Sequence, residues 1–111
     1  MLFITLLAIS SSAVADYPHT LNIGVLRADC ELLDRASQVR CEAFLMGVFD
    51  TVKALTSAGK LNENYFCAPQ GMTEIRLRQV FVEDGAAGYT DTSVPAVDVV
   101  LGAFSRAFPC K

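Results

Sequence analysis

The chain has 111 residues, which is enough for one small domain, and its 52% apolar content argues against intrinsic disorder. Its formal charge is −3, and because acidic and basic residues are interspersed, no basic patch is available to offset phosphates. We therefore expect a single folded domain that does not bind nucleic acid.

Residues 1–15 have the pattern of a signal peptide. The apolar run LFITLLAI is followed by SSSAVA, in which Ala13 and Ala15 have the small-x-small spacing that precedes a signal-peptidase cut, although no Lys or Arg precedes the run. The run is well short of the roughly 20 residues that cross a bilayer. The sequence therefore predicts an exported, periplasmic mature chain of residues 16–111 that does not insert into the membrane.

Four cysteines would enter an oxidising compartment with this mature chain. Their even number in a small exported domain indicates two disulfides among Cys30, Cys41, Cys67 and Cys110. Their spacing contains no C-x-x-C, and the single histidine, His19, is near the expected new N-terminus. We therefore expect no metal site.

Residues 23–33 have the apolar period of a first helix. Leu26, Cys30 and Leu33 recur at steps of four and three, which places them on one helix face. A short connection, DRAS, follows them. The pattern predicts that this helix buries these three side chains.

A longer helix is predicted over residues 38–58, with Ser37 as its N-cap and Gly59 just beyond its end. The density of its apolar residues indicates the central helix of the fold. One stripe consists of Cys41, Leu45, Val48, Val52 and Leu55, and Phe44 and Phe49 flank it.

The same helix carries a second ridge of small side chains, at Ala43, Gly47, Asp50, Ala54 and Ala58. A glycine inside a helix costs about 0.8–1.0 kcal/mol relative to alanine, so Gly47 predicts that the backbone of a neighbouring helix passes close to it. Asp50 would lie at or beside that contact. Its carboxylate would then need backbone amides or an arginine as partners.

Residues 59–72 are predicted to form a loop anchored by Cys67, and Thr73 is the expected N-cap of a third helix. The apolar residues of that helix are Ile75, Leu77, Val80, Phe81 and Val82, and we expect Arg76, Arg78 and Gln79 to face water.

The segment EDGAAGYTDTS, residues 83–93, interrupts this pattern and predicts an exposed loop. Residues 93–95 then open a fourth helix, which Pro109 stops and Cys110 pins. Its expected inner face consists of Val97, Val100, Leu101, Phe104 and Phe108. The predicted fold is thus all-α, a small four-helix domain stapled by two disulfides.

Geometry favours one of the three possible disulfide pairings. Cys30 and Cys41 are equidistant from the connection between the first two helices, so an αα-hairpin would bring them opposite each other. Cys67 would then pair with Cys110. In the chain-entropy model these loops contribute about 3 and about 4 kcal/mol.

The sequence offers no evident catalytic group. Nucleophilic catalysis needs a base beside the nucleophile, and the chain has only one poorly placed histidine. The segment GAAG neither follows a strand nor opens a helix, so it is not a phosphate-binding loop. We expect no catalytic residue and no cofactor, and a protein that acts by binding.

Several short motifs occur in an order that resembles a known family. They are Cys41-x-x-Phe44-x-x-Gly47-x-x-Asp50, Phe66-Cys67-Ala68-Pro69, Thr73-x-x-x-Leu77-x-x-Val80 and Phe108-Pro109-Cys110. With the export signal, they resemble the Tai family of type VI secretion amidase immunity proteins, also called the Rap/Tai family.

The resemblance implies an all-α periplasmic protein, often dimeric and not itself an enzyme. Such a protein binds a peptidoglycan amidase delivered by a neighbouring bacterium and blocks its cysteine-histidine active site. The matching positions look like scaffold rather than toxin contacts: Cys41, Phe44, Gly47, Asp50, Cys67, Pro69, Pro109 and Cys110.

For the partner-binding surface we select Glu83, Asp84, Tyr89 and Asp91. An exposed aromatic ring among carboxylates can insert into a cleft and offer hydrogen-bond acceptors at its rim. The competing interpretation is an ordinary solvated loop.

Three other functions stay open at this point. One is a periplasmic holdase like the small acid-stress chaperones, which are also exported, helical and disulfide-bonded. The second is an orphan helical binding domain, and the third is an enzyme that uses a free thiol. Two free thiols would rule out the two-disulfide interpretation.

Overall fold

The computed structural model describes residues 21–84 and 90–111, and within these ranges the fold consists of four α-helices. They are α1 (Ile23–Glu31), α2 (Arg35–Ser57), α3 (Glu74–Asp84) and α4 (Ala96–Ala107). Two disulfides join Cys30 to Cys41 and Cys67 to Cys110. The predicted all-α domain with four helices and two disulfides is confirmed.

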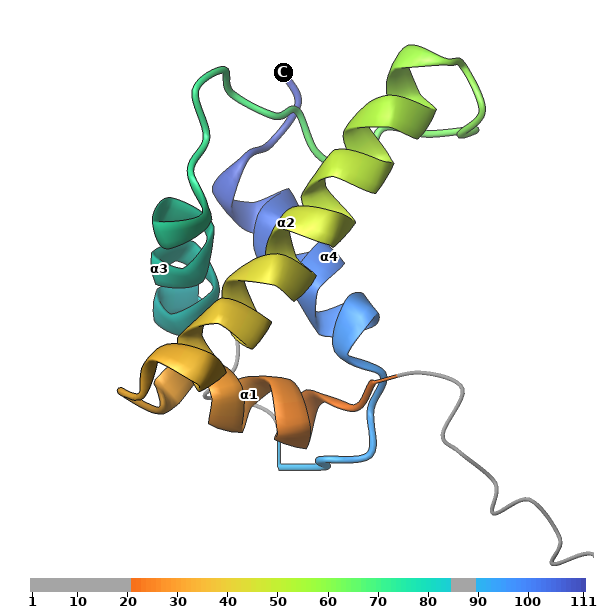
Figure 1. Ribbon diagram of the computed structural model, residues 1–111. Helices are drawn as coiled ribbons and strands as arrows, with labels where there is room; N and C mark the ends of the chain where they lie inside the picture. Colours follow the sequence, from red (N-terminus) through yellow and green to blue (C-terminus); the bar gives the residue numbers. More distant parts are fainter. Residues whose placement is uncertain (1–20, 85–89) are drawn as a thin grey trace, which may run out of the picture.

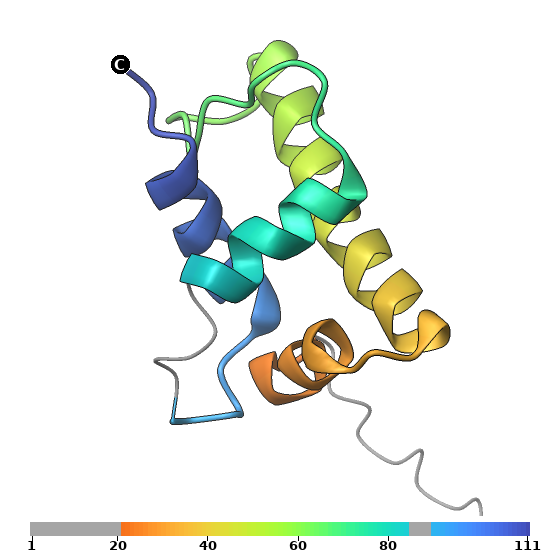
Figure 2. The ribbon, with the colours of Figure 1, turned by 90° about the vertical axis from the view of Figure 1, so that its left-hand side faces the viewer.

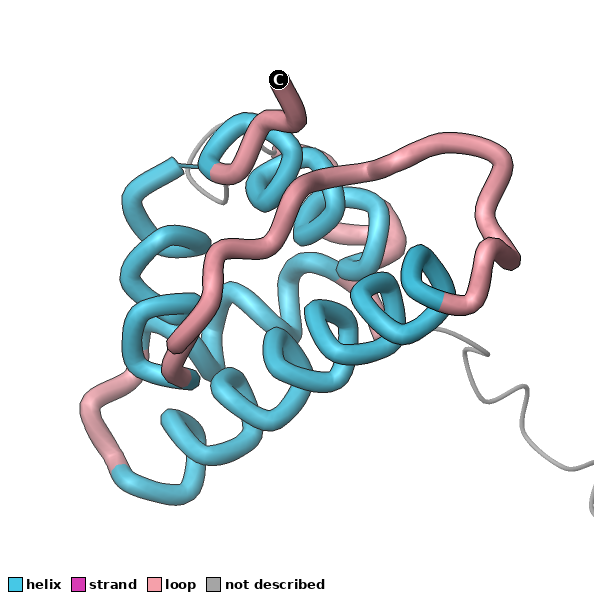
Figure 3. The backbone as a smooth tube through the Cα atoms, turned by 90° about the horizontal axis from the view of Figure 1, so that it is seen from above, coloured by secondary structure: helices cyan, strands magenta, loops and turns pink. Residues whose placement is uncertain are grey.

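The long helix α2 is the centre of the bundle and contacts the other three helices (Figure 1). In the view turned by 90°, α3 lies across α2 and α4 (Figure 2). Helix α1 lies at the end of the bundle where α2 begins. The loop between α2 and α3 crosses the bundle at the end opposite α1 (Figure 3). Each helix contributes fully buried side chains to one shared core, among them Leu26, Leu45, Phe81 and Phe104.

Helix α1 is shorter than its apolar period predicted. It ends at Glu31, and Leu32 is already extended, with its N–H donating to the Ala28 carbonyl. Leu26 and Cys30 are buried as expected, but Leu33 is 89% exposed in the connection to α2. The prediction that Leu33 packs in the core was wrong because the helix ends two residues before Leu33, so Leu33 does not continue the helical stripe of Leu26 and Cys30.

Helix α2 begins three residues earlier than predicted, because Asp34 and not Ser37 is its N-cap. The Asp34 carboxylate accepts a hydrogen bond from the Ser37 backbone N–H at 2.9 Å. This bond favours the charged form and holds the pKa of Asp34 below its ordinary value. At the other end, Gly59 has a φ of 65°, the left-handed conformation that its position predicted.

Helix α3 starts at the predicted cap, since the Thr73 hydroxyl accepts from the Arg76 N–H at 3.2 Å. The expectation that Arg78 faces water was wrong. Its guanidinium lies 3.3 Å from the carboxylate of Glu42, which is only 8% exposed on the inner side of α2. A buried carboxylate needs such a partner, so this ion pair joins α2 to α3.

Helix α4 is turned relative to its predicted inner face. Val100 and Phe104 are buried, as are Val99 and Ala103, which the period did not select. Val97 and Leu101 are only half-buried, and they line a groove between α4 and α2.

The two disulfides differ in exposure. Cys30 and Cys41 are 3% and 0% exposed, whereas Cys67 and Cys110 both lie on the surface. The second bond ties the α2–α3 loop to the C-terminal tail, where the Cys67 N–H also donates to the Phe108 carbonyl at 2.8 Å.

Aromatic packing lies directly beneath this surface bond. Phe66 stacks on Phe49 with ring centroids 5.5 Å apart, and Phe104 and Phe108 meet both rings at 5.4 to 6.4 Å. The Phe and the Cys of the motifs at 66–67 and 108–110 therefore act together. The ring enters the core while the cysteine closes the surface above it.

Candidate partner-binding surface

The residues selected from the sequence fall at the two ends of the α3–α4 connection. Glu83 and Asp84 close α3, and Asp91 precedes α4, all three exposed. Tyr89 lies in residues 85–89, outside the described part of the chain. The first end lies against the last turn of α4, and the second end runs beside the start of α1 (Figure 2).

Asp84 fixes the first end of this connection. Its carboxylate pairs with the Arg106 guanidinium of α4 at 2.9 Å. The Asp84 and Arg106 side chains are 30% and 54% exposed, so the pair stabilises the fold by no more than about 0–1 kcal/mol. Its main effect is to hold the last turn of α3 against the last turn of α4.

Asp91 fixes the second end through a tight turn. Its carboxylate accepts hydrogen bonds from the Ser93 N–H at 3.0 Å and from the Ser93 hydroxyl at 2.6 Å. These bonds, the hydroxyl's first, hold the pKa of Asp91 below its ordinary value, so the carboxylate is charged near neutral pH.

The segment after this turn is bonded to the start of α1. The Ile23 N–H donates to the Val94 carbonyl at 2.8 Å, and the Ala96 N–H donates to the Leu21 carbonyl at 2.7 Å. A third bond, 3.3 Å long, runs from the Gly24 N–H to the Thr92 carbonyl. These three backbone hydrogen bonds therefore hold the second end of the connection against the start of α1.

Gly24 is the residue that sequence reasoning missed at this site. An ideal Cβ on Gly24 would lie 2.8 Å from the Thr92 Cβ, closer than real Cβ atoms come. The glycine therefore allows the segment before α4 to approach α1. Its only sequence signal was a glycine in the first turn of a helix, which suggests a weak start rather than a contact.

Glu83 differs from its neighbours, because it makes no hydrogen bond or ion pair with the described residues. It lines a shallow groove of about 360 Å³ together with Arg76, Val80, Asp84, Arg106 and Ala107. Of the selected carboxylates, Glu83 is thus the one available to a partner, while Asp84 and Asp91 hold the ends of the segment.

The close helix contact predicted at Gly47 does not occur among the described residues. A Cβ on Gly47 would meet no described atom within 4 Å, and the whole small ridge from Ala43 to Ala58 is exposed. Asp50 is also exposed and has no partner among the described residues. The helices of this domain pack on other faces of α2, so the ridge stays uncovered.

The other motif residues are distributed between core and surface. Phe44 is half-buried against the core, while Pro69 and Pro109 are exposed beside the Cys67–Cys110 bond. In the motifs that contain Pro69 and Pro109, it is therefore the phenylalanines, and not the prolines, that pack in the aromatic cluster.

The chemistry available in the described residues is limited. All four cysteines are in disulfides, so the thiol-enzyme alternative has no free nucleophile in this state. Within residues 21–84 and 90–111, no group of three His, Cys, Asp or Glu side chains is placed to hold a metal ion. In the same ranges no helix has the length and apolarity needed to span a membrane.

The described residues thus form a small helical domain stapled by two disulfides, in which acidic side chains hold helix ends and turns. The chain belongs to the Rap1a immunity protein family, whose model matches residues 22–110. No curated protein and no solved structure matches it. Membership implies an immunity protein that binds a secreted toxin and is not itself an enzyme, in agreement with the Rap/Tai resemblance of the motifs.

Proposed function

We propose that this protein protects its cell from a peptidoglycan amidase delivered by type VI secretion. Residues 1–15 would be removed as a signal peptide, and residues 16–111 would act in the periplasm by blocking the amidase active site. Membership of the immunity protein family carries this proposal. The two disulfides support it, because such bonds persist in oxidising compartments.

The α3–α4 connection is the proposed toxin-binding surface. Its ends are held by the Asp84–Arg106 pair and by the Asp91–Ser93 turn. Fixing the ends before binding lowers the entropy lost on association. Tyr89 would insert into the amidase cleft, Glu83 would bond its rim, and Asp84 and Asp91 would position both.

We also propose that the protein acts as a homodimer, as the Rap/Tai resemblance implies. The whole assembly would then present two copies of the α3–α4 connection. Binding of one amidase per protomer is the expected stoichiometry.

The direct test titrates the mature chain into the purified amidase encoded beside its own gene and follows peptidoglycan hydrolysis. Stoichiometric inhibition supports the proposal. An amidase that stays active in the presence of excess mature chain contradicts the proposal. Binding of the mature chain to many unfolded proteins only at acid pH also contradicts it and favours a chaperone.

Matched variants test the surface. Tyr89→Ala should weaken amidase binding by at least about 30-fold, the effect of a hot spot worth about 2 kcal/mol. Tyr65→Ala is the control, because Tyr65 is a 40% exposed tyrosine in the loop at the opposite end. Glu83→Ala should weaken binding, whereas Glu63→Ala in that opposite loop should not. Equal effects of the paired variants would place the toxin elsewhere.

A further inference from the structure

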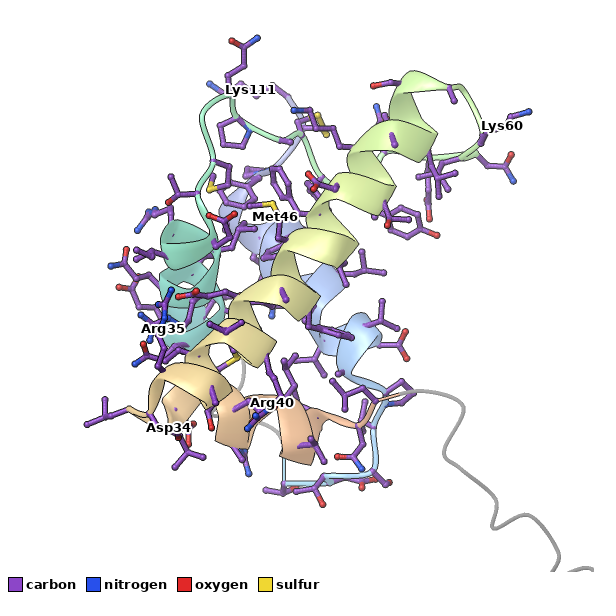
Figure 4. All side chains as sticks on the ribbon, in the orientation of Figure 1. Asp34, Arg35, Arg40, Met46, Lys60 and Lys111 are labelled. Carbon is purple, nitrogen blue, oxygen red and sulfur yellow. A yellow bond between two sulfur atoms is a disulfide. The ribbon has the colours of Figure 1, made fainter. Side chains whose placement is uncertain are left out.

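The Cys67–Cys110 disulfide is a reactive group that the proposed immunity function leaves unused. Both cysteines are exposed, and the bond joins the α2–α3 loop to residues 109–111. Figure 4 shows a disulfide near Lys111, at the end of the bundle opposite α1. Cys30 and Cys41 are 3% and 0% exposed, so of the two bonds only Cys67–Cys110 is open to a thiol in solution while the domain stays folded.

A cleft opens beside Cys67. It has a volume of about 300 Å³, with Lys53 and Thr56 of α2 on one side and Asn64 and Cys67 of the loop on the other. Small-molecule sites have volumes of about 300–1,000 Å³, so this cleft is at the lower end of that range. The space suits a small molecule rather than a protein segment.

The position of the cleft determines which sulfur atom a bound thiolate attacks. In thiol–disulfide exchange the thiolate attacks one sulfur and the other leaves, with the attacking atom in line with the bond that breaks. Cys67 lines the cleft, whereas Cys110 does not. A thiolate in the cleft is therefore placed to attack Cys67 Sγ and to displace Cys110 Sγ.

The environment of Cys110 suits a leaving group. In the part of the chain that the structure describes, residues 109–111 make no hydrogen bond, and the last one before them joins the Cys67 N–H to the Phe108 carbonyl at 2.8 Å. Lys111 follows Cys110, and a neighbouring ammonium group favours the thiolate form of a cysteine. Once the disulfide opens, the Cys110 thiolate can therefore move away from Cys67.

The cleft also selects for the charge of the thiol. Among the described residues that line it, Lys53 is the one charged residue, and Lys53 makes no ion pair with the rest of them. The Thr56 hydroxyl is buried and has no hydrogen-bond partner among these residues. Buried polar groups normally bond a protein group, a water or a ligand. A carboxylate on the thiol would give the ammonium group an ion pair and the hydroxyl an acceptor.

We propose that Cys67 is a site of reversible S-thiolation by a small thiol that carries a carboxylate, with Lys53 binding that carboxylate. The thiolate RS⁻ forms a bond to Cys67 Sγ as the Cys67–Cys110 bond breaks, and Cys110 Sγ leaves with the electron pair and takes a proton from water. One disulfide replaces another, so no oxidant or reductant is consumed. Attack by the Cys110 thiolate on Cys67 reverses the step. This inference does not depend on the proposed immunity function.

The test exposes the mature chain to three small thiols of different charge, namely thioglycolate, mercaptoethanol and cysteamine. N-ethylmaleimide stops each reaction and caps the released thiol before the disulfide re-forms. Digestion in acid without reduction, followed by mass spectrometry, locates both groups. We expect the thiol adduct on Cys67 and the maleimide on Cys110, with the Cys30–Cys41 bond intact.

Lys53→Gln tests the cleft, and Lys60→Gln is the control because Lys60 is exposed in the same loop but does not line the cleft (Figure 4). Each thiol is compared between variants, so its own nucleophilicity cancels. Lys53→Gln should slow thioglycolate by about threefold, the effect of one exposed ion pair, and should slow mercaptoethanol less and cysteamine least. Lys60→Gln should change none of the three rates.

Three results would overturn the proposal. One is an adduct on Cys110 in place of Cys67, and another is an equal effect of the two lysine variants on thioglycolate. The third is reaction of all four cysteines together, which would mean that the thiol reacts only with the unfolded chain. Circular dichroism of both variants verifies that the helices are intact.

Discussion

Gly24 of α1 and Thr92 of the segment before α4 approach so closely that a Cβ on the glycine would lie 2.8 Å from the threonine Cβ. The contact joins the first helix to the second end of the α3–α4 connection, where the Gly24 N–H bonds the Thr92 carbonyl. The placement of the proposed toxin-binding segment thus depends on a glycine near the start of the domain.

Gly24→Ala should therefore destabilise the domain. The obstructing atom is a Cβ, which cannot rotate away, so the backbone of residues 91–95 must shift. Overpacking of this kind costs about 1–3 kcal/mol, more than the roughly 0.8–1.0 kcal/mol that alanine gains in helix propensity. Urea unfolding measures the change. An unchanged or higher free energy of unfolding would show that the segment yields freely.

Gly47→Ala is the contrasting variant and should stabilise the monomer. No described atom lies within 4 Å of the added methyl group, so the helix propensity of alanine applies in full, about 0.8–1.0 kcal/mol. Urea unfolding at low protein concentration measures the change in the free energy of unfolding. A loss of stability would mean that a neighbouring element does cover Gly47.

These two glycines show how far sequence reasoning reaches. Period and capping patterns predicted four helices and the Thr73 cap, because these depend on neighbours along the chain. They could not predict which glycine contacts another segment, since that depends on which faces the helices turn toward each other. For the same reason the ion pair between the buried Glu42 and Arg78 was missed. A charged residue gives no sequence signal of a partner on another helix.

The candidate site was predictable only in part. Composition identified the exposed carboxylates of residues 83–91, but not their different roles. Asp84 bonds Arg106, 22 positions away, and no local pattern indicates that pair. The pairing of Asp91 with Ser93 is local, and a search for side-chain turns of this type could have found it.

Acid should weaken the domain partly through Asp34. Its pKa is lowered in the folded state, first by the Ser37 backbone hydrogen bond, from the ordinary value of 3.8. The folded state therefore binds fewer protons, and the stabilisation is present above pH 3.8 and is lost as the pH falls through the folded pKa.

The variant Asp34→Asn isolates this contribution. Asparagine keeps the helix cap but does not titrate, so its stability should fall less than that of the parent chain when the pH drops below 3.8. Urea unfolding on both sides of that pH measures the difference. Identical losses in the two proteins would remove Asp34 from the acid response.

The disulfides should open in sequence under a dithiol reductant. Cys67 and Cys110 are exposed, whereas Cys30 and Cys41 are buried, so alkylation with mass spectrometry should find the first pair modified earlier. Replacing both Cys67 and Cys110 by alanine should cost about 4 kcal/mol in the chain-entropy model. Simultaneous modification of all four cysteines would mean that reduction requires global unfolding.

Protection of living cells tests the immunity claim most directly. Cells that export the neighbouring amidase to their periplasm would carry either the whole chain or a chain that starts at residue 16 after the initiator methionine. The whole chain should restore growth, and N-terminal sequencing of its periplasmic form should begin at Asp16, while the truncated chain should give no protection. Lysis of cells in which the periplasm contains the folded protein would contradict the proposed function.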